Sequence, residues 1–287
     1  MTITLDWYGC ATYRLTIDGL VVFLDTYMDR PDGAPGVPLT TAEVREADYA
    51  LIGHSHWDHL AGADVIAKQT GATVIGSHES ARVLRERGVP EEQLWTPQGG
   101  ERFRLSEDVT VRVYPSMHSC IWSRAGAPGK PIVGDYGTTE NEKEERLASR
   151  RAARGETFYA SMAHSSSTGG PLDFLIETPE GSILFQDSMG YWTGLYAHLN
   201  PDVALLAAAG RGNIDGEPIQ GAVEDFIVRE VELLRPKRVI LGHHDNFAGV
   251  EGAPDLTDLG PVEEMLARVT PGVEVVPMEL GGRVMLF

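Results

Sequence analysis

Gly53-His54-Ser55-His56-Trp57-Asp58-His59-Leu60-Ala61-Gly62 gathers three of the nine histidines of the chain and one aspartate into six residues. The preceding residues, 48–52, form an apolar run of strand length, and residues 60–69 have the apolar spacing of a helix. The sequence therefore predicts a turn between a strand and a helix at this stretch. Such a turn can point several side chains into one cavity.

The residue types in this turn are those that bind divalent metals. Imidazole nitrogens and a carboxylate in the pattern HxHxDH suit zinc, and they also suit manganese or iron. The alternative is a polar surface loop that happens to be rich in histidine. A single histidine would favour that alternative, whereas four potential ligands at the end of a predicted strand favour a metal site.

Potential ligands also follow three later predicted strands. They are His118 after residues 109–115, Asp187 after residues 183–186, and the pair His243 and His244 after residues 238–242. The HxHxDH turn is thus followed along the chain by a histidine, an aspartate and a last histidine, each at the end of a strand.

This set of residues resembles the metal-binding signature of the metallo-β-lactamase superfamily, and the resemblance extends over nearly the whole chain. It implies an α/β fold of the four-layer αβ/βα sandwich type. It also implies two divalent metal ions as cofactors: His54, His56 and His118 would hold one, Asp58, His59 and His243 the other, and Asp187 would bridge both. His243 is favoured over His244 because the histidine at the strand end is the ligand in the branch resembled.

The carboxylate of Asp187, where a cysteine would be the alternative, leaves a ligand set of nitrogen and oxygen only. A ligand set of this kind favours zinc as the bound metal, and manganese or iron could also bind. It also weakens an assignment as a β-lactamase. The spacing and the last motif are closer to the lactonase and phosphodiesterase branch of the superfamily.

Other residues near these ligands have roles that the resemblance suggests. Asp25 ends a predicted strand, where an aspartate in the family orients a metal-binding histidine; a turn or helix cap is the alternative. His244, Asp245 and His164 are candidates for substrate contact or for proton donation to a leaving group, and hydrogen-bonded loop residues are the alternative. Cys10 stands where many relatives have histidine, and it is either a thiol near the metals or a small buried side chain.

The expected function is that of a dinuclear metal-dependent hydrolase, in which a metal-bridging hydroxide attacks a small anionic ester, lactone or phosphodiester. Asp58, His244 and Asp25 are the candidate catalytic residues beside the metal ligands. Six basic residues are candidates for binding an anionic group, with surface charge as the default explanation: Arg124, Lys130, Arg150, Arg151, Arg154 and Arg211.

Two alternatives use the same fold. A di-iron oxidoreductase is disfavoured because the chain has no added flavin-binding domain and keeps the hydrolase-like HxHxDH form. An inactive metal-binding scaffold is disfavoured because an idle site would gain nothing from burying so many polar groups.

Composition limits the remaining possibilities. A length of 287 residues with 42% hydrophobic residues suits one domain, residues 1–287, with a large core. The net charge of -18 disfavours nucleic-acid binding. The sequence has no apolar run long enough for a membrane span, no secretory leader, and only two cysteines, so we expect a cytoplasmic protein that acts on a small molecule.

The rest of the chain predicts two β-meanders, each with helices. Residues 3–8, 12–17 and 20–25 are predicted strands, and residues 220–234 form the clearest amphipathic helix. Residues 121–168 read as an insertion that covers the metal cleft or mediates association into a homo-oligomer.

Overall fold

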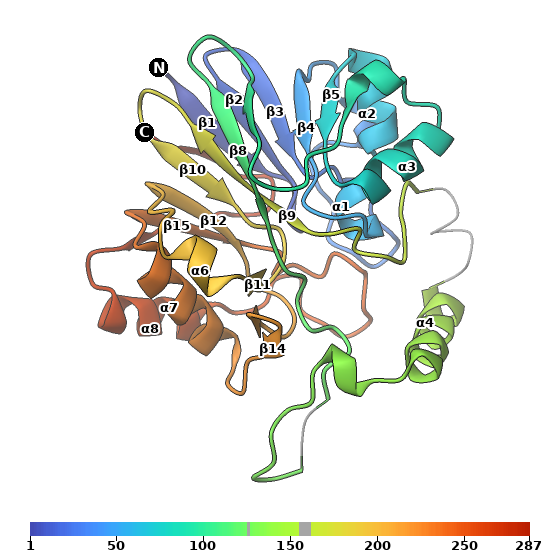
Figure 1. Cartoon of the computed structure of the whole chain (residues 1–287), viewed down its shortest axis with the longest axis vertical. Helices are drawn as coiled ribbons and strands as arrows, with labels where there is room; N and C mark the ends of the chain where they lie inside the picture. The colour runs from blue at the N-terminus through green and yellow to red at the C-terminus, as the bar shows by residue number, and fades with distance from the viewer. Residues whose placement is uncertain (125–126, 155–161) are drawn as a thin grey trace.

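The structure is a computed structural model that describes residues 1–124, 127–154 and 162–287. Two seven-stranded sheets form its centre (Figure 1). The first sheet has the order β17 (Arg283–Met285), β1 (Ile3–Trp7), β2 (Tyr13–Ile17), β3 (Leu20–Leu24), β4 (Tyr49–Leu51), β5 (Thr73–Ile75), β6 (Leu94–Trp95). The second has the order β16 (Glu274–Val275), β15 (Arg238–Gly242), β12 (Val203–Ala207), β10 (Ser182–Phe185), β9 (Leu172–Glu177), β8 (Thr110–Pro115), β7 (Arg102–Arg104).

Helices cover the outer face of each sheet (Figure 1). Those beside the first sheet are α1 (Trp57–Leu60), α2 (Ala63–Thr70) and α3 (His78–Glu86), with the short 3₁₀ helices η1 (Thr41–Glu43) and η2 (Glu91–Gln93). Those beside the second sheet are α6 (Thr193–Tyr196), α7 (Val223–Leu234) and α8 (Gly260–Val269). A small third sheet contains β11 (Gly190–Tyr191), β13 (Asn213–Ile214) and β14 (Glu217–Pro218). None of the described helices has both the length and the apolar character needed to cross a membrane.

Three apolar layers hold these elements together, and strand alternation explains them. In β3, Val22 and Leu24 face the core between the two sheets, whereas Val21 and Phe23 pack toward the helices of the first sheet. In β12, Val203 and Leu205 join the central core, while its alternate residues join the cluster with α7 and α8. The predicted four-layer αβ/βα sandwich is therefore confirmed.

The strand directions place the functional turns at one edge. β3, β4 and β5 are parallel neighbours, as are β10, β12 and β15, so their carboxyl ends point the same way within each sheet. β8 is antiparallel to β9, which is antiparallel to β10, so β8 runs in the same direction as β10. In parallel α/β sheets, ligands bind at the carboxyl ends of the strands.

Two predicted helices have different limits in the structure. The continuous helix expected over residues 60–69 is instead two helices, α1 and α2, separated at Gly62, whose φ is +90°. The helix expected over 220–234 begins at Val223, because the Asp225 carboxylate accepts a hydrogen bond from the backbone N–H of Ala222 and caps the helix there.

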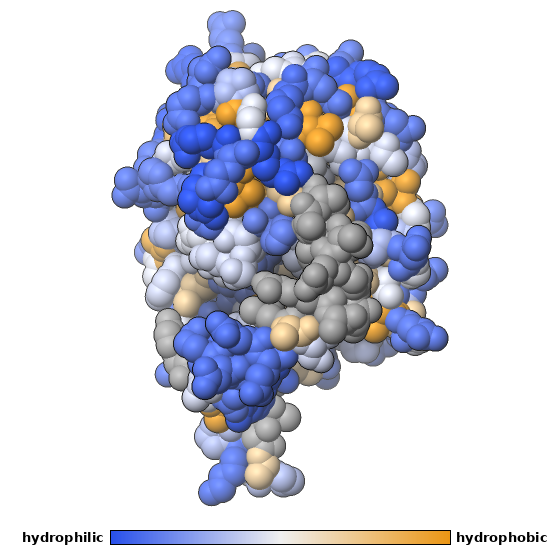
Figure 2. All heavy atoms as spheres, turned by 90° about the vertical axis from the view of Figure 1, so that its right-hand side faces the viewer, coloured by the Kyte–Doolittle hydropathy of each residue, from blue (hydrophilic) through white to orange (hydrophobic). Residues whose placement is uncertain are grey.

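The residues predicted as an insertion leave the sandwich between β8 and β9 (Figure 1). Their described parts include η3 (Asp135–Gly137) and α4 (Glu140–Arg154), while residues 125–126 and 155–161 lie outside the described residues. Figure 2 shows a hydrophilic surface over the lower part of the molecule, where α4 lies. The first turn of α4 carries Glu140 and Glu142, which suits the positive end of the helix dipole.

Candidate metal centre

The first group of potential ligands comes from the turn after β4 and from the residues after β8. One ring nitrogen from each of His54, His56 and His118 lies within 4.8 Å of the other two. Nε2 of His54 is 3.1 Å from Nδ1 of His56. The ring of His118 lies 4.6 Å from that of His54 and 4.7 Å from that of His56. These three nitrogens can therefore converge on one ion.

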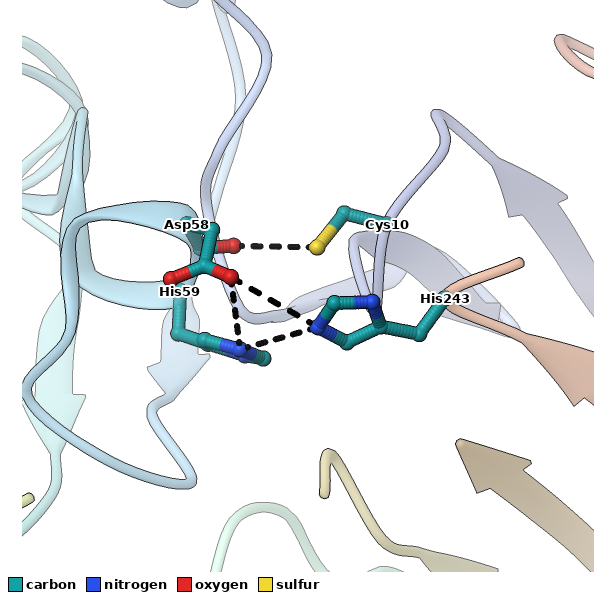
Figure 3. A group of neighbouring side chains, drawn as sticks. All are labelled: Cys10, Asp58, His59 and His243. Atoms are coloured by element: carbon teal, nitrogen blue, oxygen red, sulfur yellow. Dashed lines mark hydrogen bonds and ion pairs between the residues drawn. The ribbon is translucent and has the colours of Figure 1, made fainter. Parts of the chain in front are cut away.

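The second group joins α1 to the end of β15. Nε2 of His59 lies 3.3 Å from Nε2 of His243, and Oδ2 of Asp58 lies 3.6 Å from each of these nitrogens. In Figure 3 these side chains reach from two separate parts of the chain toward a common space, together with the thiol of Cys10. His244, the next residue, does not take part in this group.

Asp187 follows β10 and lies between the two groups. Its Oδ2 is 2.6 Å from Nδ1 of His54 and 3.3 Å from Nδ1 of His59, so it contacts one histidine of each group. Its Oδ1 is buried without a hydrogen-bond partner. The motif begins with Gly53 because a Cβ there would lie 2.1 Å from Oδ2 of Asp187.

Burial favours uncharged histidines at this site. Removal from water lowers the pKa of His54 and of His56 to about 3, and it lowers the pKa of His59 and of His118 well below the usual value. A neutral imidazole has a free lone pair, which metal coordination requires.

The buried carboxylate also fits a cation. Burial raises the pKa of Asp187 to about 7, because desolvation disfavours its charged form. Its Oδ2 contacts the rings of His54 and His59, and burial keeps both of these imidazoles uncharged. An unpartnered carboxylate oxygen surrounded by neutral imidazoles is the donor set that a divalent metal needs, and the residues present fit such an ion.

Backbone conformation directs several of these side chains. Cys10, Asp25 and His243 have φ values of 48°, 50° and 60°, in the left-handed region that residues other than glycine seldom adopt. Each such conformation costs about 1 kcal/mol or more and persists where the surrounding structure fixes it. Here, all three residues lie at turns that follow strands and face the second group.

Asp25 contacts His59 of the second group at Nδ1, the ring nitrogen opposite the one that faces Asp58 and His243. Its Oδ2 lies 2.7 Å from Nδ1 of His59, and its Oδ1 accepts a hydrogen bond of 3.0 Å from the backbone N–H of Gly53. Burial, and then the nearby Asp187, raise the pKa of Asp25. The contact with Nδ1 leaves Nε2 of His59 directed toward Asp58 and His243.

The structure places His244 and Asp245 away from the ligands of the first group. The His244 ring stacks on Trp7 with a centroid distance of 4.9 Å, and it is not among the described residues that line the main cavity. Asp245 accepts hydrogen bonds from the backbone N–H of Cys10 at 2.7 Å and from Arg30 at 2.9 Å. A catalytic role for His244 remains a prediction, and its position beside Trp7 gives it no support.

A cavity of about 450 Å³ opens over both groups. Five of the potential ligands line it: His56, Asp58, His59, His118 and His243. The aromatic residues Trp57, Trp122 and Phe247 also line it, as does His164. Among the described residues that line this cavity, none is Lys or Arg.

Sequence reasoning did not identify Arg30 or the aromatic walls. Nη1 of Arg30 binds Asp245 and Nη2 donates to the backbone oxygen of Tyr8, so this arginine ties the loop after β3 to the turn after β15. A single arginine in a loop rich in proline and glycine carries no sequence signal of such a contact. The predicted anion-binding residues Arg124 and Arg211 instead bond to Glu142 and to the backbone oxygen of Gly221.

The sequence matches known proteins over most of its length. A family model described as a β-lactamase superfamily domain matches residues 21–135. A UPF0173 metal-dependent hydrolase from Pyrobaculum arsenaticum is 27% identical over 262 residues, which cover 88% of each chain.

Two solved structures share the fold. Igni18, a metallo hydrolase from Ignicoccus hospitalis, has a TM-score of 0.63 at 18% identity and covers 99% of this chain and 98% of its own. CmlA, a diiron β-hydroxylase from Streptomyces venezuelae, has a TM-score of 0.62 at 16% identity and covers 99% of this chain but 54% of its own. At these identities the likeness concerns the fold alone. The chain is therefore similar in sequence to a β-lactamase superfamily domain and to metal-dependent hydrolases of nearly its whole length, and similar in fold to solved metallo hydrolases.

Proposed function

We propose that the chain is a dinuclear hydrolase with one divalent ion in each of the two ligand groups. His54, His56 and His118 would hold the first ion, Asp58, His59 and His243 the second, and Asp187 would contact both. The observation that carries this proposal is the position of Asp187, whose Oδ2 lies within 3.3 Å of a histidine from each group while its Oδ1 has no partner. Zinc is the first choice of metal, with manganese or iron as alternatives.

When bound, two such ions would lower the pKa of a bound water to about 7 and would stabilise the negative charge that develops during hydrolysis. The protein contributes the arrangement of the donors. Asp25 holds the ring of His59 through Nδ1, and the neutral imidazoles present their lone pairs without first losing a proton. The aromatic walls give the cavity apolar surface, and electrostatic interactions are stronger beside such surface than in bulk water.

His164 is our candidate for protonating the leaving group. It lines the cavity, and its Nδ1 is 3.1 Å from the backbone oxygen of Met162. This contact holds the ring through Nδ1 where the residue lines the cavity. The candidate differs from His244, which lies beside Trp7.

The cavity favours a substrate with an apolar part next to the bond that is hydrolysed. Trp57, Trp122 and Phe247 provide flat apolar walls, and the described lining has no Lys or Arg to neutralise a phosphate. We therefore propose a small ester or lactone as the first substrate class and a phosphodiester as the second. An anionic group would depend on the metal ions for its neutralisation.

The test combines metal analysis with a substrate panel. We expect two ions per chain after loading with zinc or manganese, and hydrolysis of some members of a panel of lactones, aryl esters and phosphodiesters. Asp58→Ala and His118→Ala should abolish hydrolysis while the circular dichroism spectrum stays unchanged. A loaded protein that binds fewer than two ions would contradict the dinuclear proposal. Oxygen-dependent turnover with iron, in the absence of hydrolysis, would support the oxidoreductase alternative instead.

The pair His243 and His244 gives a matched test of the ligand assignment. His243→Ala should lower the metal content by one ion per chain, because Nε2 of His243 faces His59 and Asp58. His244→Ala should retain both ions and lose mainly the stacking on Trp7. The opposite result, with one ion lost only in His244→Ala, would reverse the assignment.

A further inference from the structure

The turn between β1 and β2 brings a thiol to the second ligand group. Cys10 is fully buried, and its Sγ is 3.3 Å from the backbone oxygen of Asp58. One donor atom from each of Cys10, Asp58, His59 and His243 lies within 4.8 Å of every other (Figure 3). The group therefore has four potential donors, although the HxHxDH pattern and the last motif account for only three.

The position of this thiol is fixed relative to His243. The backbone oxygen of Cys10 accepts hydrogen bonds from the backbone N–H of His243 at 2.8 Å and from Nε1 of Trp7 at 2.9 Å. The backbone N–H of Cys10 donates to Oδ1 of Asp245 at 2.7 Å. Two residues of the turn after β15, His243 and Asp245, thus hold the two sides of the cysteine backbone.

A salt bridge strengthens this connection. Arg30 binds Oδ2 of Asp245, and its guanidinium lies over the ring of Tyr27 at 4.6 Å. The side chains of Arg30 and Asp245 are 6% and 0% exposed, so solvent screens this pair little. The Cys10 turn is consequently rigid where its thiol faces the histidines, which is the condition for a preorganised ligand.

We infer that Cys10 is a further donor to the ion in the second group, beside Asp58, His59, His243 and the shared Asp187, and that it makes this group selective for zinc over manganese. The inference rests on the proposed dinuclear function. On binding, the thiol releases its proton to solvent and the thiolate bonds to the ion, with no change in oxidation state. A thiolate is a soft ligand that zinc accepts and manganese disfavours.

The alternative role for Cys10 is that of a small buried side chain whose S–H donates to the Asp58 backbone oxygen. The two roles differ in what happens when the sulfur is replaced. A ligand contributes an electronic transition with the metal and part of the metal affinity, whereas a packing residue contributes neither.

Cobalt substitution distinguishes these roles without an activity assay. Wild-type protein loaded with two Co²⁺ ions should show a thiolate-to-cobalt charge-transfer band in the near ultraviolet. Cys10→Ser and Cys10→Ala should lose this band and keep the weaker visible bands from the histidine ligands. Cys120→Ser is the matched control, because Cys120 is the other buried cysteine and belongs to none of the ligand groups among the described residues. It should keep the band.

Metal competition gives the second readout. Cys10→Ser should bind zinc at the second group about tenfold or more weakly than the wild type, with manganese affinity changed less. Two bound cobalt ions without a charge-transfer band, or a band that persists in Cys10→Ser, would overturn this inference and leave the dinuclear proposal standing. Failure to bind cobalt at all would overturn both.

Discussion

At the scale of single residues, the site depends on side chains that touch ligands without being ligands themselves. Asp25 uses both of its carboxylate oxygens, one for His59 and one for the backbone N–H of Gly53. It therefore joins the end of β3 to both ends of the metal-binding turn. Because the carboxylate is fully buried, its two hydrogen bonds have no competition from water.

Asp25→Asn tests this positioning role. An asparagine has one acceptor oxygen, so it can accept a hydrogen bond from His59 or from the backbone N–H of Gly53, and its amide N–H group then faces the other donor. We expect a loss of about 10–100-fold in metal affinity at the second group with the fold retained, measured by competition with a chelator. Asp6→Asn is a suitable control, because Asp6 is a buried aspartate of the same sheet that pairs with Arg14 and Arg283. Equal affinities in the two variants would argue against a positioning role.

At the scale of elements, the segment that enters β9 is attached to the metal-binding turn. The backbone N–H of Ser165 donates to the oxygen of Ser55 at 2.8 Å, and the N–H of Ser55 donates to the oxygen of Thr168 at 3.1 Å. The hydroxyl of Ser165 also donates to Glu79 in α3. The attached segment includes His164, Ser165 and Ser166, which line the cavity.

Two adjacent glycines allow a matched test of this attachment. A Cβ on Gly169 would lie 2.4 Å from Oγ of Ser55 and 2.5 Å from Cβ of Glu79, whereas a Cβ on Gly170 would have nothing within 4 Å. Both residues have positive φ, so the backbone penalty of alanine is similar at the two positions.

We therefore expect Gly169→Ala to destabilise the protein by about 1–3 kcal/mol more than Gly170→Ala, measured by denaturant unfolding. Gly169→Ala should also raise KM several-fold at unchanged metal content, because residues 164–166 line the cavity. If both variants have the same KM, the segment does not shape the binding site.

The elements also show why part of the site was predictable from sequence. Strand ends were predictable because apolar runs such as residues 238–242 stand out before polar residues such as His243. The attachment at Ser55 was not, since Ser165 and Thr168 lie in a polar stretch without periodicity. The helix break at Gly62 was missed because Leu60, Ala63 and Ala67 keep helical spacing across it. The backbone leaves the helical conformation at Ala61, whose ψ is 133°, and at Gly62, whose φ is +90°.

At the scale of the whole molecule, a buried polar network lies behind the metal centre. Oδ2 of Asp173 in β9 accepts a hydrogen bond of 2.7 Å from the hydroxyl of Tyr196, and Nε2 of Gln186 donates to that hydroxyl at 3.0 Å and to Glu230 of α7 at 2.5 Å. Gln186 immediately precedes Asp187. The network thus connects a helix of the outer layer to a potential ligand.

Asp173→Asn tests the effect of this burial on stability. Burial raises the pKa of Asp173 to about 8, above the 3.8 of an exposed aspartate, so the folded state holds this proton more tightly than the unfolded state. Its contribution to stability is therefore full below about pH 4 and is lost as the pH rises to about 8. The melting temperature of Asp173→Asn relative to wild type should increase from about pH 5 to about pH 8.

The melting temperature of Glu230→Gln relative to wild type should also increase with pH, because burial raises the pKa of Glu230 well above its usual value. Tyr196 stays protonated throughout this range, since burial raises the pKa of its hydroxyl. Parallel pH profiles for wild type and Asp173→Asn would show that Asp173 does not titrate in this interval.

The last prediction concerns metal removal, and it follows from the position of the site between the two sheets. Asp25 and residues 54–59 follow strands of the first sheet, whereas His118, Asp187 and His243 follow strands of the second. Bound ions would link the sheets at this edge, and chelation would leave the Asp187 carboxylate buried beside His54 and His59 without a compensating cation. The melting temperature should therefore fall on chelation, by the equivalent of about 2.7 kcal/mol per site when free metal had been 100 times its Kd. The fall in melting temperature on chelation should be smaller in Asp187→Asn, whereas the control Asp6→Asn should show the full fall. An unchanged melting temperature of the wild type on chelation would mean that the apolar core alone holds the sheets together.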